Sequence, residues 1–136
     1  MDITVEALVN NTLEQVWAAW VTPEHVMQWN FASEDWCCPA ASVDLKEGGR
    51  FNYRMEAKDQ SFGFDLEGQF DRIESLSCIE YHLDDERRVS VSFQSVSGGV
   101  QVTQTFEAED THTEEQQKEG WQAILNNFKT HAESLS

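Results

Sequence analysis

The chain has 136 residues, 40% of them hydrophobic and 11% aromatic, which is enough for one domain, expected over residues 1–136, with one core. Its 25 acidic and 9 basic residues give a net charge of −16, which argues against nucleic acid or an anionic membrane as partner, because phosphates would be repelled. No apolar run approaches the ~20 residues of a membrane span and no export signal precedes the first strand, so we expect a cytoplasmic protein.

The cysteines and histidines lack the spacing of a metal site. Cys37 and Cys38 are adjacent instead of forming a C-x-x-C pair, and the four histidines are scattered singly. We therefore expect free thiols, no bound metal and no cofactor.

The N-terminal part predicts a strand followed by two short helices. Alternating apolar residues predict the strand over 2–9. The first helix is capped either by Asn11 or by Thr12, and Thr22-Pro23 supplies the N-cap and first residue of the second. Residues 30–40 show neither helical nor strand period, so their aromatic side chains are expected either to cap a core or to line the mouth of a cavity.

The middle of the chain predicts six further strands connected by hairpins. They are expected over residues 42–46, 50–57, 62–70, 76–83, 87–96 and 100–106. The alternation slips before Ile73, as a β-bulge would cause it to do. Together with the first strand, these segments predict an antiparallel sheet of about seven strands.

The last segment, residues 113–135, predicts one long helix that covers this sheet. Thr113 and Gln116 form a capping-box pattern at its start, and apolar residues recur at helical spacing from Trp121 onward. Gly120 is unfavourable inside a helix by about 1 kcal/mol relative to alanine, so we expect close packing or a need for cavity space there. The order of elements predicts an α+β fold in which a curved sheet surrounds the final helix.

A set of residues spread over nearly the whole chain carries a family resemblance. In order, they are Val16-Trp17, Trp20, Thr22-Pro23-Glu24, Trp29, Asp44-Leu45, Gly48-Gly49-x-Phe51, Gly68-x-Phe70-x-x-Ile73 and Gly120-Trp121. Their order and spacing resemble the homologues of the heat-shock protein 90 ATPase activator, a family of the START-like (SRPBCC) superfamily. The resemblance implies the helix-grip fold, with a hydrophobic cavity between the concave sheet and the last helix. It implies no universal catalytic residue, and we assign none.

The candidate ligand-binding residues combine large apolar side chains with two amides. They are Trp29, Phe31 and Trp36 at one end, Tyr53, Met55, Phe64, Phe93 and Gln104 on inward strand faces, and Gln117, Trp121, Leu125 and Phe128 on the helix. Ligand pockets commonly pair apolar walls with a few such amides. In a packed core, the same amides would instead bond to each other, to backbone or to water. The pattern favours these two interpretations equally.

The favoured function is non-catalytic binding of a hydrophobic or amphipathic small molecule. Its buried end should be neutral or cationic, because we find no Lys or Arg at inward positions. One alternative is a START-like cyclase or hydrolase using His25, Glu34 or Tyr53 as an acid or base, although no G-x-S-x-G motif is present. The other alternative is an interaction module that binds a chaperone or another protein.

Overall fold

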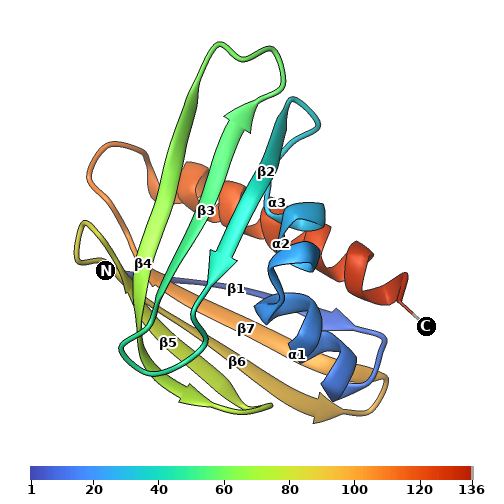
Figure 1. The fold of residues 1–136 in the computed structure, drawn as a ribbon. Coiled ribbons are helices and arrows are strands. Elements are labelled where there is room, and N and C mark those ends of the chain that lie inside the picture. The colour runs from blue at the N-terminus through green and yellow to red at the C-terminus, as the bar shows by residue number, and fades with distance from the viewer. Residues whose placement is uncertain (136) are drawn as a thin grey trace.

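The fold is a curved antiparallel sheet of seven strands with three helices on its concave side (Figure 1). A computed structural model describes residues 1–135. The elements are β1 (Asp2–Val9), α1 (Leu13–Val21), α2 (Pro23–Trp29), β2 (Trp36–Val43), β3 (Arg50–Ala57), β4 (Gly63–Glu74), β5 (Cys78–Leu83), β6 (Arg88–Val96), β7 (Gly99–Glu107) and α3 (Glu114–Glu133). This arrangement confirms the predicted α+β helix-grip fold.

The strands lie in the order β1-β7-β6-β5-β4-β3-β2, so every strand except β1 pairs with its neighbour in sequence. Because side chains alternate between the two faces of a strand, every second residue points toward the helices. In β1, for example, Ile3, Val5 and Val9 are buried while Thr4 is exposed. The register of β4 shifts between Phe70 and Arg72, which confirms the predicted bulge.

Helix α3 begins with the predicted capping box. The Thr113 hydroxyl accepts a hydrogen bond from the Gln116 amide nitrogen at 3.1 Å, and the Gln116 side chain accepts one from the Thr113 nitrogen at 3.0 Å. The helix then packs along β1 and beside α1 and α2. These contacts hold it over the concave face of the sheet.

Two asparagines fasten α3 to the N-terminal helices. The Asn127 amide donates to the carbonyl oxygen of Phe31 at 2.6 Å. Asn11 donates to the carbonyl oxygens of Ala132 and Leu135 at 2.8 and 3.1 Å. The N-cap of α1 is therefore Thr12, the other predicted alternative, whose hydroxyl accepts from the Gln15 nitrogen.

One strand prediction is wrong. The sequence predicts an irregular segment over 30–40 and a strand over 42–46, whereas the structure forms β2 and places a turn after Val43. The reason is a register shift between Cys37 and Ala40, which interrupts the two-residue alternation. Proline is tolerated at position 39 because β2 is an edge strand.

The expectation of close packing at Gly120 is also wrong. A Cβ added at Gly120 would meet no atom within 4 Å, so the helix is not pressed against anything there. Close approach occurs instead at Gly68 in β4, where a Cβ would lie 2.6 Å from both the Phe51 ring and the His82 carbonyl oxygen. Across residues 1–135, none of the helices combines the length and apolarity needed to cross a membrane.

Candidate functional site

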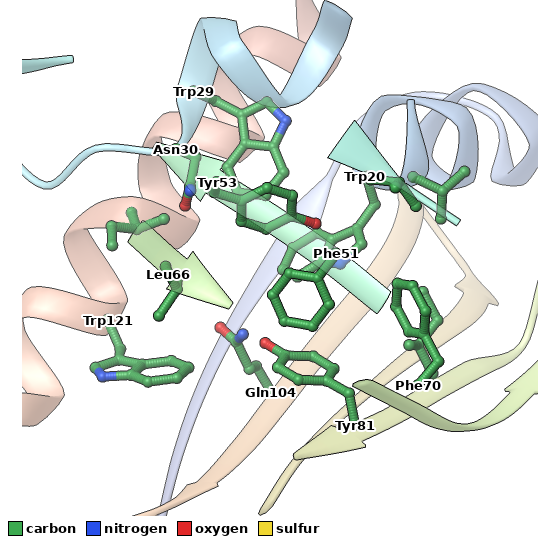
Figure 2. Close-up of a pocket in the computed structure, with 14 residues that line it drawn as sticks. Trp20, Trp29, Asn30, Phe51, Tyr53, Leu66, Phe70, Tyr81, Gln104 and Trp121 are labelled. Carbon is green, nitrogen blue, oxygen red and sulfur yellow. The ribbon is translucent and has the colours of Figure 1, made fainter. Parts of the chain in front are cut away.

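A cavity of about 50 Å³ lies between the concave sheet and the helices (Figure 2). All three helices and strands β2, β3, β4, β5 and β7 contribute to its wall. The lining residues are Trp20, Val21, Trp29, Asn30, Val43, Phe51, Tyr53, Leu66, Phe70, Ile79, Tyr81, Gln104, Trp121 and Ile124. The cavity is therefore built from nearly every layer of the fold.

Strand register brings the lining residues of the sheet together. Phe51 and Tyr53 are two residues apart on β3 and so share its inner face. Tyr53 pairs with Leu66 on β4, and Tyr81 on β5 pairs with Phe70 of β4. Cross-strand partners have their side chains on the same face, so these positions form one continuous inner surface.

Two polar side chains, Gln104 and Tyr81, face each other at the floor of the cavity (Figure 2). Gln104 is only 6% exposed and lies on the inner face of β7 between the buried residues Val102 and Phe106. Burial raises the pKa of the Tyr81 phenol, and a hydrogen bond from the Gln104 amide partly opposes that rise. Tyr81 therefore stays protonated at neutral pH and can donate a hydrogen bond.

Tyr53 and Asn30 add two further polar groups to the wall. Burial raises the pKa of the Tyr53 phenol, so this hydroxyl is also protonated at neutral pH. Asn30 is the C-cap of α2 and is 5% exposed. Its amide donates to the sulfur of Met55 at 3.4 Å, and sulfur is a weak acceptor. Burial raises the pKa of the neighbouring Cys38 thiol, and the Asn30 amide opposes that rise.

Aromatic contacts hold the apolar walls in place. The indole of Trp121 stacks on the Phe106 ring with a centroid separation of 3.9 Å and an interplanar angle of 9°. On the opposite side, the Trp20 ring packs against Trp29 at 4.9 Å, and the Trp29 indole donates to the Ala19 carbonyl oxygen at 2.9 Å. Both walls are therefore held by contacts within the protein.

The lining residues carry no ionised group at neutral pH. Among the fourteen, the only titratable side chains are Tyr53 and Tyr81, and burial raises the pKa of both. The site therefore offers apolar contact, hydroxyl donors and amides that can donate or accept. At about 50 Å³ the cavity has room for only a few water molecules. It is smaller than the roughly 300–1,000 Å³ of sites that enclose drug-sized ligands.

Four of the twelve predicted site residues line this cavity: Trp29, Tyr53, Gln104 and Trp121. The two predicted amides behave differently. Gln117 lies outside the lining and fastens the preceding loop to α3. Its side chain accepts from the Glu109 nitrogen at 2.8 Å and donates to the carbonyl oxygens of His112 and Glu109 at 2.9 and 3.1 Å. The packed-core interpretation thus describes Gln117, while Gln104 faces the cavity.

Four other predicted residues belong to the hydrophobic core and do not line the cavity. They are Met55, Phe93, Leu125 and Phe128, each at most 6% exposed. Phe128 is fully buried because its ring packs edge-on against Trp20 and Trp29. Phe93 and Phe128 contact the lining residue Trp20, and Phe128 also contacts Trp29, so these core residues help to hold the cavity wall.

The last three predicted residues, Phe31, Trp36 and Phe64, lie outside the lining. Phe31 is half-buried and holds α3 through its carbonyl oxygen. Phe64 is on the inner face of β4, opposite Met55, yet it is 41% exposed because the hairpin formed by β3 and β4 extends past α3 (Figure 1). Its ring contacts that of Trp36.

Sequence reasoning did not single out Tyr81 or Asn30. Tyr81 could have been found, because it alternates with the buried residues Ile79 and Leu83 on β5. Asn30 ends a short helix, and nothing in its local pattern indicates that its side chain turns inward. Trp20, one of the residues that carry the family resemblance, packs in the core and also lines the cavity.

Comparison with known proteins identifies one family and several structures with the same fold. The family model described as "Activator of Hsp90 ATPase homolog 1-like protein" matches residues 10–133. The solution structure of an AHSA1-like protein from Aeromonas hydrophila is 46% identical, with 98% of this chain and 93% of that chain covered and a TM-score of 0.93. The solution structure of Chr148 from Cytophaga hutchinsonii is 42% identical, covers 98% and 92% of the two chains and has a TM-score of 0.84.

More distant structures share the fold alone. The crystal structure of NE0264 from Nitrosomonas europaea is 18% identical, covers 98% of this chain and 95% of that chain, and has a TM-score of 0.86. A search among curated proteins finds no match.

Proposed function

This chain belongs to the family of Activator of Hsp90 ATPase homolog 1-like proteins, and on that premise we propose that it binds an uncharged, hydrophobic or amphipathic small molecule without chemical conversion. The bound end of the ligand occupies the cavity between the sheet and α3. The observation that carries this proposal is the pair Gln104 and Tyr81, two polar groups at the floor of a cavity whose other lining residues, apart from Tyr53 and Asn30, are apolar. Such groups fix the orientation of a ligand while apolar walls supply affinity.

The electrostatics of the lining support an uncharged head group. A buried carboxylate would lose its hydration and find no Lys or Arg among the lining residues. The net charge of −16 repels anions further. A buried cation would find no carboxylate in the same wall. An alcohol, phenol, ketone or amide can exchange hydrogen bonds with Gln104, Tyr81 and Asn30 without these costs.

The same lining favours binding over catalysis. General acid–base catalysis needs a group whose pKa lies near the working pH. Burial moves the pKa of both cavity tyrosines away from neutrality, in the upward direction. The other candidate acid–base groups lie elsewhere: His25 is bonded to His131, and Glu34 is exposed in the loop before β2.

Two experiments test the proposal. Mass spectrometry of the gently isolated protein should detect a co-purified uncharged ligand. In an NMR titration with neutral phenols, the indole signals of Trp29 and Trp121 should shift saturably, while that of Trp17, which packs in the core against Phe93, should move little. If no neutral compound perturbs the cavity tryptophans, the proposal fails.

Two cavity variants and one control variant test whether the ligand binds at Gln104 and Tyr81. Gln104→Leu and Tyr81→Phe remove polar groups at nearly constant volume, and each should weaken a phenol about threefold to tenfold, the equivalent of one net hydrogen bond. Gln101→Leu is the control, because Gln101 lies on the outer face of the same strand and bonds to Glu6. It should leave the affinity unchanged.

A further inference from the structure

We propose that the ligand carries an apolar tail which leaves the cavity and lies on an exposed aromatic patch formed by Trp36, Phe62 and Phe64. This inference rests on the proposed function and specifies its ligand class: an uncharged polar head with an extended hydrocarbon or aromatic tail. The patch lies where β2 begins and where the hairpin between β3 and β4 turns (Figure 1).

The three rings form one contiguous apolar surface. The Trp36 centroid is 5.9 Å from that of Phe62 and 6.1 Å from that of Phe64, and the two phenylalanines are 6.2 Å apart. Phe62 is 61% exposed and Phe64 is 41% exposed. Single exposed apolar residues are ordinary, but a contiguous cluster of aromatic rings usually marks a binding surface.

Strand register makes this patch the direct continuation of the cavity wall. Tyr53 and Leu66 form a cross-strand pair that lines the cavity. The next pair outward on the same face is Met55 with Phe64. One step further, the Ala57 nitrogen donates to the Phe62 carbonyl oxygen.

Trp36 closes the patch from the neighbouring strand. It pairs with Ala57 across β2 and β3, and its ring contacts both phenylalanines. An apolar tail that passes Leu66 would therefore meet Phe64 first and then Phe62 and Trp36.

The charged residues in the two strands of this hairpin point away from the cavity, while Lys58 and Asp59 at its turn border the patch beside Trp36 and Phe62. Arg54 is bonded to Glu56 at 2.9 Å and to Asp65 at 3.4 Å. These residues alternate with Tyr53, Met55 and their partners, so they lie on the outer face. Between the cavity and the patch, the inner face of the hairpin itself presents Leu66, Met55 and Phe64, which are apolar.

The size of the cavity makes an external tail necessary for a larger ligand. A volume of about 50 Å³ has room only for a group the size of a hydroxyl, carbonyl or amide, while sites that enclose a whole drug-sized ligand measure roughly 300–1,000 Å³. The remaining ligand surface must then lie outside the cavity. The patch is the exposed aromatic surface that adjoins it on the same sheet face.

The test compares para-methylphenol with para-heptylphenol, which share an uncharged head and differ in tail length. Dissociation constants are measured by calorimetry on the wild type, on the double variant Phe62→Ser/Phe64→Ser and on the control Leu45→Ser/Val96→Ser. The control residues are also exposed and apolar, at 40% each, but lie away from the patch. On the wild type the longer phenol should bind more tightly, by about fourfold for each methylene that the patch buries.

The patch variant should lose at least about tenfold in affinity for para-heptylphenol and keep the wild-type affinity for para-methylphenol, whereas the control should match the wild type for both. The Trp36 indole signal should shift with the long phenol only. If the methyl compound binds but the heptyl gain survives in the patch variant, the tail inference is overturned and a protein-docking role of the patch is favoured. If neither phenol binds the wild type, the proposed function itself fails.

Discussion

His25 of α2 and His131 near the end of α3 are hydrogen-bonded to each other, with 2.9 Å between Nδ1 of His25 and Nε2 of His131. One ring must supply the proton and the other must accept it, so the bond cannot form when both rings are protonated. Partial burial, and secondarily the neighbouring His25, lower the pKa of His131. The pair joins the helix that carries Trp29 to the helix that carries Trp121.

This pair predicts a loss of stability in mild acid. The pKa of His131 is lower in the folded state than in the unfolded state, so the unfolded state binds the proton more readily. The stability that His131 contributes is therefore fully present above the unfolded-state pKa of about 6.5. It is lost as the pH falls through the folded-state pKa. His131→Ala should cost about 1 kcal/mol near pH 8, where the hydrogen bond exists. Below the folded-state pKa the cost should disappear. Urea denaturation of the wild type and the variant, near pH 8 and in mild acid, measures this cost in free energy of unfolding. An equal cost at all pH values would contradict the prediction.

Gly120→Ala is expected to stabilise the protein. The substitution meets no atom within 4 Å, so only helix propensity changes, and alanine is favoured over glycine by about 1 kcal/mol. The midpoint of urea denaturation should rise with an unchanged slope. A lower midpoint would mean that the position is packed after all.

Gly68→Ala should have the opposite effect. Its Cβ would lie 2.6 Å from the Phe51 ring and 2.6 Å from the backbone oxygen of His82. Backbone cannot yield as a flexible side chain does, so we expect a loss of about 1–3 kcal/mol, typical of overpacking. The same denaturation experiment gives the answer, and a variant as stable as Gly120→Ala would refute the tight approach of β3 and β5 to this residue.

The fold could be predicted because most strands alternate regularly and α3 carries its own start signal. Two-residue alternation locates β1 and β3 at their observed bounds, and the capping box at Thr113 marks the start of α3. The same reasoning fails for β2, whose irregular register between Cys37 and Ala40 hides the period. It fails at Gly120 because helix propensity does not reveal whether a neighbour is present.

The site could be predicted only in part. Gln104 is recognisable because it is a polar residue in register with Val102 and Phe106 on an inward face. The position of Phe64 depends on how far the hairpin extends past α3, which the alternation of β4 does not encode. Whether Gln117 meets a ligand or the backbone depends on the loop before α3, and local pattern does not fix that loop.

The cavity is proposed to bind uncharged ligands. The most direct test of this binding is a calorimetric comparison of para-ethylphenol with para-ethylbenzoate at neutral pH. The two compounds share the ethyl-substituted ring and differ in the charge of the head group. We predict that the phenol binds saturably, that the benzoate binds at least about tenfold more weakly because its carboxylate would be buried without a cationic partner, and that Gln104→Leu weakens the phenol alone. Equal or tighter binding of the benzoate would contradict the account.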